Sequence, residues 1–429
     1  MRNIAAHSRG RPRGHARSGV IWEAAENGNL KKARNMDKYS QLSGSGNCHI
    51  IALMSGTSVD AIDGVLVNIS GTLLDARVTV LHEARHRWPA ELRDRILAVM
   101  APAVTPTAEI CRLNVLTARR FAALAGEIAS CGKIEHRQIA AIASHGQTLC
   151  HLPADSTGAD GSTLQIGDIS TIAQLSGIPT IGNFRMADMA VGGQGAPLAP
   201  FADQLLLTHA QRYRCVQNIG GIGNVTFLPP RGAAEEPIIA FDTGPGNMLM
   251  DALAAIFSSG AECCDHAGRR AATGRIIPPL LDELQSHPYF RQPPPKSTGR
   301  EIFGRQMAEK MVQEYATATP ADMMATAAEL TAWSIADAYR LFLPRFPDEV
   351  IVCGGGLYND HLMRRLNHHL FGRDGGAVES IDSFGLPNQS REAICFALLG
   401  WAFLKGFAGN LPAATGAHRA VICGQYAPP

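Results

Sequence analysis

An order of strands and turns that occurs twice constrains the fold of this 429-residue chain more than any other feature. The first copy begins at residue 48, where two β-branched runs flank a small polar turn and a third strand follows (CHIIALM, SGTSVDAID, GVLVNIS, TLLDARVTV). The second copy begins near residue 213 with YRCVQN, GGIGNVTFLP and PIIAFDTG. Such runs separated by turns are typical of strands and hairpins. The repetition concerns element order rather than sequence identity, and it predicts two similar halves.

Stretches with helical spacing of apolar residues follow each set of strands, and each half then contains a further buried strand (IAAIAS and EVIVCGG). The expected helices are residues 91–101, 108–131, 248–257, 278–287, 304–316, 324–343 and 361–370. This order predicts an α/β fold with mixed sheets flanked by helices, and the chain is longer than one core usually serves. We expect an N-terminal lobe over 48–210, a C-terminal lobe over 211–429 and a cleft between them. The last helix could return to the N-terminal lobe.

The charge of the chain is unevenly distributed. Residues 1–47 contain nine Lys or Arg and three acidic residues, whereas residues 48–429 contain thirty and thirty-five. A basic, Gly-rich segment with few apolar residues cannot offset its ordering entropy, so we expect a disordered extension. Its four arginines between residues 9 and 17 leave open an attachment to nucleic acid or an anionic membrane, or a targeting peptide. A solvated extension, or a translation start at Met36, is the simpler interpretation.

Composition excludes several classes of protein. The ten cysteines contain no C-x-x-C pair and no histidine spacing that would build a structural zinc site. Most lie in apolar stretches, such as Cys353 and Cys395, and are expected to be small buried side chains in a reducing compartment. No apolar run approaches the ~20 residues of a membrane helix, and the N-terminus lacks the apolar segment of a signal peptide. We expect a cytoplasmic protein that binds neither nucleic acid nor a membrane.

The first hairpin turn has the composition of a phosphate-binding site. Residues 55–63 combine a glycine and hydroxyl side chains with two acids, Asp60 and Asp63. Backbone N–H groups that converge, hydroxyl donors, and carboxylates that can hold a hydrated Mg²⁺ all serve a polyphosphate. An ordinary solvent-exposed hairpin is the alternative, although two acids spaced by three are less expected there.

Three further glycine-rich turns lie at residues 218–224, 241–247 and 352–359. Glycines at this density are tolerated where phosphates approach the backbone. The last turn joins a buried strand to a helix, a place where adenine stacks on bare backbone, and it lacks the G-x-G-x-x-G pattern of dinucleotide sites. Asp242 is a second candidate carboxylate for a metal or a water. Purely structural tight turns are the alternative, but together the turns suggest a nucleotide held from both halves.

Polar residues that could bind a sugar are concentrated in the centre of the chain (SHGQT, TLQIGD, NFRMAD and GGQGAP). A general base must be a carboxylate or an imidazole near the acceptor, and Asp188 beside Arg185 is the best candidate. An Asp three residues after an Arg is usually a surface pair, and a histidine such as His145 is more often structural than catalytic. The surrounding motifs favour an interdomain substrate site instead.

Together these motifs resemble the anhydro-N-acetylmuramic acid kinase family, a branch of the sugar kinase, Hsp70 and actin superfamily. The matching segments run in family order from residue 54 to residue 417: MSGTSVDAID, ASHGQTLCHLP, TLQIGDIS, NFRMADMAVGGQGAPLAP, NIGGIGNVTF, AFDTGPGNMLMDAL, HPYF, PPKSTGREIF, ELTAWSIA, CGGGLYN, EAICFALLGWAF and ATGA. The resemblance implies a two-lobed actin-like (ribonuclease H-like) fold with the active site in the interlobe cleft, and a homodimer. It implies an ATP- and Mg²⁺-dependent conversion of 1,6-anhydro-N-acetylmuramic acid to N-acetylmuramic acid 6-phosphate in peptidoglycan recycling. The family couples hydrolysis of the anhydro bond to phosphoryl transfer.

The resemblance also implies roles for particular residues. Asp188 would be the catalytic base that activates the water attacking the anomeric carbon. The ATP-binding residues would be Gly56, Thr57, Ser58, Val59, Asp60, Ala61, Ile62, Asp63, Gly220, Gly221, Asp242, Gly244, Gly354, Gly355 and Gly356. The substrate contacts would be His145, Gln147, Arg185 and Glu329, the last with a plain helix-surface glutamate as its alternative. Asp60, Asp63 or Asp242 would hold Mg²⁺.

The chain departs from the family's usual pattern in three places. Ala61 stands where the family usually has glycine, which matters if the residue needs a positive φ or touches a phosphate. Asn183 replaces an aspartate, and residues 388–391 lack the usual acidic or lysine character. A catalytically impaired relative is therefore one alternative. The others are another kinase of the superfamily, such as a hexose or acetate kinase, and an ATP-gated binding or chaperone module, for which no peptide-binding domain follows residue 417.

Overall fold

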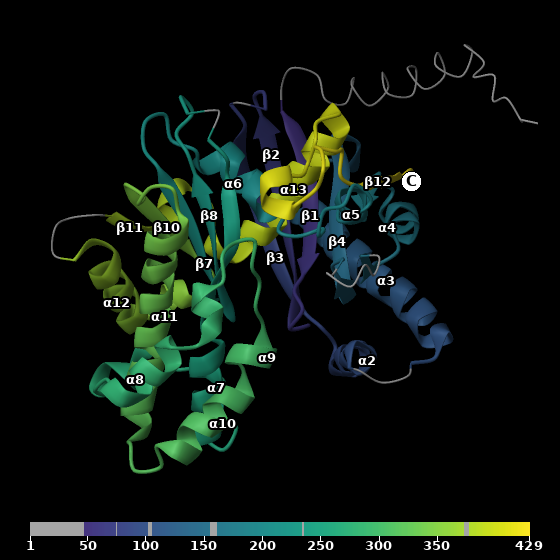
Figure 1. The fold of residues 1–429 in the computed structure, drawn as a ribbon. Helices are drawn as coiled ribbons and strands as arrows, with labels where there is room; N and C mark the ends of the chain where they lie inside the picture. Colours follow the sequence, from purple (N-terminus) through teal and green to yellow (C-terminus); the bar gives the residue numbers. More distant parts are fainter. Residues whose placement is uncertain (1–46, 74, 102–104, 155–160, 234–235, 373–376) are drawn as a thin grey trace, which may run out of the picture. The chain divides into compact units, whose positions relative to one another are not determined.

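The apolar strands predicted at the start of each half form the centres of two β-sheets in the computed structural model (Figure 1). The structure describes residues 47–429 apart from 74, 102–104, 155–160, 234–235 and 373–376, so the predicted basic extension and Met36 lie outside the described residues. The strands of the first sheet are β1 (Cys48–Ser55), β2 (Ala61–Ser70), β3 (Arg77–Arg87), β4 (Ile139–Leu152), β5 (Ser162–Ile166), β6 (Thr180–Gly182) and β12 (Gln425–Ala427). Those of the second are β7 (Arg214–Ile219), β8 (Ile222–Leu228), β9 (Ile239–Pro245), β10 (Glu349–Cys353) and β11 (Ala377–Ser380).

The two sheets share one topology. The first has the order β3-β2-β1-β4-β6, and the second has the order β9-β8-β7-β10-β11. In both, the first strand of the half lies in the middle, with its two hairpin neighbours on one side and two later strands on the other. In each sheet the first three strands are antiparallel neighbours and the later two run parallel to the first. The predicted duplication is confirmed, and with it the two-lobed arrangement that the resemblance implied.

Burial explains why the central and edge strands have different sequences. β1 is a nearly continuous apolar run, and its side chains are buried on both faces of the sheet. β3 lies at the edge and alternates exposed and partly buried residues along its whole length, the period of a strand with one covered face. The short strands β5, β6 and β12 were not among the sequence-based expectations, because runs of three to five residues carry little periodic signal.

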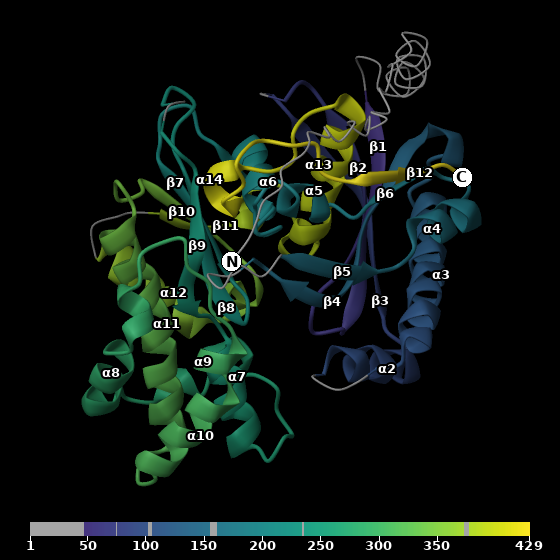
Figure 2. The same ribbon diagram turned by 45° about the vertical axis from the view of Figure 1, so that its right-hand side comes forward.

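Helices cover the outer faces of both sheets and fill the space between them (Figures 1 and 2). α2, α3 and α4 pack on the outer face of the first sheet, whereas α7, α8, α10, α11 and α12 pack on that of the second. A third apolar cluster joins α6 and α13 to both sheets. The helices are α2 (Ala90–Met100), α3 (Thr107–Cys131), α4 (Ile169–Ser176), α5 (Met186–Met189), α6 (Ala199–Leu207), α7 (Met248–Phe257), α8 (Pro278–Gln285), α9 (Arg300–Phe303), α10 (Arg305–Glu314), α11 (Pro320–Phe342), α12 (Asp360–Phe371), α13 (Arg391–Lys405) and α14 (Pro412–Thr415).

Short 3₁₀ turns connect several of these elements. They are η1 (His136–Gln138), η2 (His266–Gly268), η3 (Ala271–Thr273), η4 (Pro288–Arg291), η5 (Gly355–Tyr358), η6 (Ile381–Phe384) and η7 (Asn388–Ser390). The turn η5 follows β10 directly and contains two residues of the triple glycine, so that motif lies between a buried strand and a helix as its sequence predicts.

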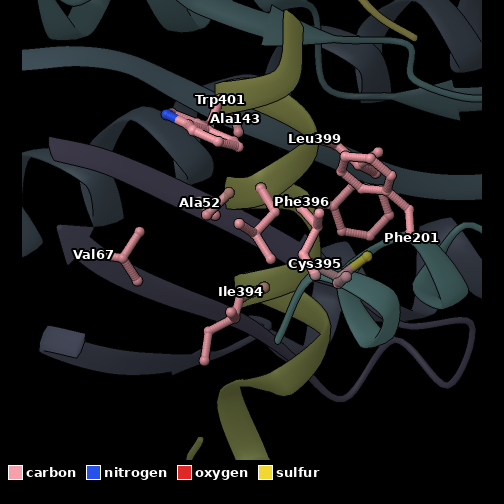
Figure 3. Packing of buried hydrophobic residues seen from close by; sticks show 14 of the residues in the cluster. Ala52, Val67, Ala143, Phe201, Ile394, Cys395, Phe396, Leu399 and Trp401 are labelled. Carbon is pink, nitrogen blue, oxygen red and sulfur yellow. The ribbon is translucent and has the colours of Figure 1, made fainter. Parts of the chain in front are cut away.

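The chain returns to the first sheet after residue 390. Helix α13 contacts β1, β2 and β4, and β12 pairs antiparallel with β6. Figure 3 shows Phe396, Leu399 and Trp401 of α13 close to Ala52 and Ala143 of the sheet. Gly400 permits this approach, because a Cβ there would lie 2.8 Å from the Cβ of Ala143. The first lobe is therefore built from two separate chain segments.

The cysteines are less uniformly buried than their sequence contexts suggest. All ten are free thiols, and five are buried, including Cys353 and Cys395 as expected. Four lie at the surface instead, on α3, on β4 or in a loop: Cys111, Cys131, Cys150 and Cys263. An apolar local sequence on an amphipathic helix predicts burial only for residues on its inner face. Among the described residues, we find no helix with the length and apolar character that a membrane crossing needs.

Candidate active site

A pocket of about 370 Å³ lies between the two sheets and takes residues from both halves of the chain. The first half contributes Met54, His151, Arg185 and Gln194, the second half contributes Asn218, Asn224, Asp242 and Lys296, and α13 contributes Glu392, Cys395 and Phe396. The lining therefore combines three cations (Arg185, Lys296 and Arg391), two carboxylates and several amides with an apolar wall. Such a mixture of apolar surface and convergent polar groups is typical of a small-molecule site.

The predicted phosphate turn is held from beneath by a buried polar network. The Ser55 hydroxyl donates to Gln147 Oε1 (2.6 Å) and accepts from Trp88 Nε1 (3.0 Å), while Gln147 Nε2 donates to the Gly56 carbonyl (3.2 Å). Gln147 is completely buried. It therefore connects β4 to the turn between β1 and β2, and its position fits support of the turn rather than a contact with sugar. Its predicted role as a substrate contact stays a prediction.

The backbone of this turn adopts an unusual conformation at Val59. Its φ of 55° lies in the left-handed region, which β-branched residues rarely occupy, and its N–H donates to the Gly56 carbonyl (3.1 Å). The Val59 side chain is fully buried in the core under α3, so packing offsets the backbone strain. Ala61 does not have a positive φ and begins β2, so the strain considered for its β-carbon does not arise. Asn183 has φ 53°, which asparagine tolerates well.

The glycines of the turns fall into two groups. A Cβ at Gly56, Gly220 or Gly355 would meet no atom closer than 3.4 Å, so their backbones are open to a ligand. At three others a Cβ would collide with the protein itself, lying 2.9 Å from Phe290 at Gly244, 2.6 Å from Asn218 at Gly354 and 2.3 Å from Ile219 at Gly356. Internal packing is thus sufficient to explain why Gly244, Gly354 and Gly356 are glycines. The close approach of a phosphate is needed as an explanation only for the three glycines with open backbones.

The three candidate metal carboxylates have different surroundings. Asp60 lies 3.8 Å from Arg93 on α2, and Asp63 lies 3.3 Å from Arg85 on β3. Asp242 lines the pocket, and its Oδ2 accepts the Thr298 N–H (3.0 Å). Burial raises the pKa of Asp242 to about 6, despite the opposing effects of that hydrogen bond and of Lys296. Among the described residues, no three carboxylate, histidine or cysteine side chains are arranged to hold a metal by themselves.

Asp188 is completely buried and does not itself line the pocket. It lies beside the lining, because its partner Gly195 stands between Gln194 and Ala196, which do line the pocket. Its Oδ1 accepts hydrogen bonds from Asn410 Nδ2 (2.6 Å) and Thr415 Oγ1 (2.7 Å), and its Oδ2 accepts the Gly195 N–H (2.8 Å). A Cβ at Gly193 would lie 2.1 Å from Oδ2, so only glycine fits beside the carboxylate there. These three donors hold the carboxylate of Asp188 in one orientation.

Two further predicted substrate residues lie outside the pocket lining. His145 is buried behind Arg185, which donates to its Nε2 from Nε (3.1 Å) and Nη2 (2.9 Å). Glu329 on α11 binds Arg365 Nη2 (2.8 Å) and His369 (2.8 Å) of α12. Burial alone would raise the pKa of Glu329, but these hydrogen bonds lower it to about 2. Direct contact of either residue with a substrate stays a prediction.

Residues 388–391, which depart from the family pattern, make specific contacts. Asn388 accepts the Gly354 N–H (2.7 Å) and donates to the Gly354 carbonyl (3.0 Å), so it fixes the triple-glycine turn. Ser390 donates to Glu83 of β3 (2.6 Å), and Arg391 pairs with buried Asp203 (2.6 Å). These contacts join the second half of the chain to β3 and α6.

Sequence reasoning missed several residues of this site. Asn410, Thr415, Lys296 and His151 were not assigned roles, although Thr415 lies in the ATGA segment, Lys296 in PPKSTGREIF and His151 in ASHGQTLCHLP. Their occurrence in these family motifs was a usable signal for these three. Asn410 lies outside every motif, and only the fold reveals its contact with Asp188.

The repeated sheet topology and the charged pocket between the sheets, with a buried carboxylate beside it, define a two-lobed α/β protein of the actin-like class. The chain belongs to the anhydro-N-acetylmuramic acid kinase family, whose model matches residues 48–429. It is 46% identical over 378 residues to the anhydro-N-acetylmuramic acid kinase of Gloeobacter violaceus, covering 88% of this chain and 98% of the relative. The protein of the same name from Acaryochloris marina is 44% identical over 382 residues, covering 88% and 99%.

Solved structures of other proteins are similar at lower identity. The activator of the 2-hydroxyisocaproyl-CoA dehydratase from Clostridium difficile with bound ADPNP aligns over 83% of this chain and 96% of its own (12% identity, TM-score 0.39). A ROK family glucokinase from Streptomyces griseus in complex with glucose and AMPPNP aligns over 82% and 98% (13% identity, TM-score 0.32). Membership of the kinase family over residues 48–429 identifies the chain as a kinase and leaves the chaperone-module hypothesis without support.

Proposed function

We propose that the protein uses ATP to phosphorylate 1,6-anhydro-N-acetylmuramic acid at O6 while water opens the anhydro bond, giving N-acetylmuramic acid 6-phosphate and ADP in peptidoglycan recycling. The observation that carries this proposal is Asp188, a buried carboxylate beside the pocket lining that accepts three hydrogen bonds from Gly195, Asn410 and Thr415. A base fixed in this way suits the activation of a single water. The names of the relatives from Gloeobacter and Acaryochloris support the same substrate.

The bond changes balance without an additional acid. The water oxygen forms a bond to C1 as the C1–O6 bond breaks, and O6 forms a bond to the γ-phosphorus as the bond to the bridging oxygen of ADP breaks. Asp188 accepts the proton of the attacking water. Because the phosphoryl group captures the electron pair that develops on O6, no side chain has to protonate that oxygen.

The open backbones at Gly56, Gly220 and Gly355 suit the binding of ATP from three turns, one in the first half of the chain and two in the second. Asp242 fits a Mg²⁺ ligand, because its carboxylate lines the pocket and only one of its oxygens has a hydrogen-bond partner among the described residues. Asp60 and Asp63 already have arginine partners and suit the metal less well. A bound Mg²⁺ would neutralise phosphate charge.

A substrate panel tests the proposal. Purified protein with MgATP is given the anhydro sugar, N-acetylmuramic acid, glucose or acetate, and ADP release is followed together with mass spectrometry of the sugar. The proposal predicts rapid ADP release and a 6-phosphosugar with the anhydro sugar alone. Comparable turnover with glucose or acetate would assign the chain to another activity of the superfamily.

A homodimer and a cytoplasmic location belong to the proposal, the first because the family resemblance implies it and the second because the free cysteines suit a reducing compartment. Neither has a direct observation in the described part of the chain. Light scattering of the purified protein measures the first, and fractionation of cells measures the second.

A further inference from the structure

Arg185 is an enclosed cation whose hydrogen-bond partners are all neutral. It precedes α5 and lines the pocket. Its Nε and Nη2 donate to His145 Nε2 (3.1 and 2.9 Å), and its Nη1 donates to the Gly195 carbonyl (2.8 Å). His145 Nδ1 lies 3.1 Å from the Gly146 carbonyl, which fixes the tautomer that leaves Nε2 as an acceptor. Burial lowers the pKa of His145 and keeps the ring neutral.

Comparable arginines elsewhere in the chain have carboxylate partners. Arg214 pairs with Glu349 (2.5 Å) and Arg391 with Asp203 (2.6 Å), and in both pairs the side chains are largely buried. Arg185 has no ion-pair partner among the described residues, and Glu392, which also lines the pocket, does not reach ion-pair distance. An enclosed charge without a counter-ion is costly unless a ligand supplies one. Two of its five N–H groups also make none of these hydrogen bonds, so a planar anion can bind to them.

Gly195 connects this cation to the proposed base. Its N–H donates to Asp188 Oδ2 (2.8 Å), and its carbonyl accepts from Arg185 Nη1 (2.8 Å). One residue therefore sets the separation between the carboxylate and the guanidinium. In a muramic acid the lactyl carboxylate is attached through O3, two ring carbons from the anomeric carbon. If C1 of the sugar lies next to Asp188, the lactyl carboxylate on O3 would therefore lie close to Arg185.

We propose that Arg185 binds the lactyl carboxylate of the sugar and thereby makes the enzyme selective for acidic over neutral anhydro sugars. The proposal rests on the function proposed above. Of the other two pocket cations, Arg391 is already paired with Asp203 (2.6 Å), and Lys296 is less suited to this role. Its ammonium lies 4.6 Å from the Tyr289 ring centre and 4.5 Å from that of Phe342, and it donates to the Tyr289 carbonyl (3.3 Å), on the second sheet with Asp242.

Binding measurements with a matched pair of sugars test the assignment. Calorimetry compares the full-length protein's affinity for 1,6-anhydro-N-acetylmuramic acid with that for its lactyl carboxamide, which is neutral and nearly the same shape. We expect the wild-type protein to prefer the acid by on the order of 100-fold, the range of a buried charge-assisted pair. In Arg185→Gln that preference should fall to a few-fold, and in Arg185→Lys a large part of it should persist. Arg120 is an exposed residue of α3, so Arg120→Gln is the matched surface control. It should keep the wild-type ratio of the affinities for the acid and the carboxamide.

Several results would overturn the assignment. If Arg185→Gln weakened the acid and the carboxamide by the same factor, the guanidinium would serve the sugar ring or the fold rather than the carboxylate. If it weakened ADP more than the acid, it would bind a phosphate. Arg185→Lys keeps the comparison decisive if the glutamine variant fails to fold, because loss of the preference in a folded, charged variant would also contradict the proposal. Wild-type protein that binds neither sugar would instead contradict the proposed function itself.

Discussion

Asp188 depends on residues that are distant in the sequence. Asn410 and Thr415, whose side chains bind its Oδ1, follow it by 222 and 227 positions. Together with the Gly195 N–H on Oδ2, they hold the carboxylate in one orientation beside the pocket lining. Precise placement of this kind determines how effective a general base can be.

Replacing Asp188 by asparagine should abolish most turnover while leaving the fold and ADP binding intact. The side chain keeps its shape but can no longer accept a proton, a loss that typically amounts to about 10²–10⁴-fold in rate. Steady-state kinetics and ADP calorimetry measure the two effects. A variant with nearly normal kcat would show that another group is the base.

The positioning role of Thr415 has its own signature. Thr415→Val should lower kcat with little change in KM, because the base is displaced but the sugar pocket is kept, and Thr415→Ser should restore activity. Equal activity of the valine and wild-type proteins would contradict the role.

The pKa of Asp242 predicts a pH dependence of Mg²⁺-nucleotide binding. Burial raises this pKa to about 6, so the carboxylate is protonated below that pH and can no longer serve a cation. At pH 5 we expect MgADP affinity to fall by about tenfold beyond the change caused by the nucleotide's own titration. The MgADP affinity of Asp242→Asn, measured over pH 5–8, gives the change that is caused by the nucleotide's own titration. Parallel pH profiles for the two proteins would refute the prediction.

At the scale of single residues, the sequence identified which residues are suited to the chemistry better than it identified where their side chains lie. Asp188, Arg185 and Asp242 lie at or beside the pocket, as their motifs suggested. Gln147 lies under the phosphate turn, and Glu329 forms an ion pair with α12. Both positions depend on contacts between segments that are distant in the sequence. Such contacts follow from the packing of strands and helices, which one sequence does not specify.

Among the elements, helix α13 has the broadest structural role. It packs on the first sheet, lines the pocket and, at its first residue, makes a buried ion pair with Asp203 of α6. Asp203 also accepts the Thr226 hydroxyl of β8 (2.9 Å). The pair therefore connects both sheets through two helices that lie between them.

Breaking one partner of this pair should cost more stability than removing both. Asp203→Ala leaves Arg391 buried without a counter-ion, which typically costs about 3–5 kcal/mol, whereas Asp203→Leu combined with Arg391→Met removes the charge as well. Chemical denaturation of the single and double variants gives the coupling free energy. A single variant that loses less than about 1 kcal/mol would mean that water or a neighbouring group compensates the arginine.

Long elements were predictable because their apolar periodicity is sustained. The helix expected over 108–131 is α3 (Thr107–Cys131), and the run EVIVC is β10. The pairing of β12 with β6 was not predictable, since a three-residue strand has no period and its partner lies far away in the chain. The left-handed backbone at Val59 contradicts the local preference of valine, and core packing imposes it.

On the scale of the whole molecule, the repeated strand order accounts for the position of the site. Each sheet brings its first hairpin turn and its later strands toward the space where α6 and α13 lie, and the pocket takes residues from both sheets. The sequence predicted this duplication from element order alone. It also allowed for a return of the last helix to the first lobe, but it did not predict that the C-terminal segment holds Asp188.

Removal of residues 1–40 should leave turnover unchanged. The family match begins at residue 48, and all of the motifs lie between residues 54 and 417. Kinetics of the truncated and full-length proteins at equal concentration test this expectation. A loss of kcat, or a rise in the KM for the sugar, would give the basic extension a part in catalysis.

The coupled reaction is tested most directly by isotope labelling. The protein is incubated with MgATP and 1,6-anhydro-N-acetylmuramic acid in ¹⁸O-labelled water, and the products are analysed within minutes, with unlabelled N-acetylmuramic acid 6-phosphate incubated in parallel to measure anomeric exchange. The account predicts ADP and a 6-phosphosugar with one ¹⁸O at the anomeric hydroxyl and none in the phosphoryl group. Label in the phosphate, or a phosphorylated sugar whose anhydro bond is intact, would contradict it.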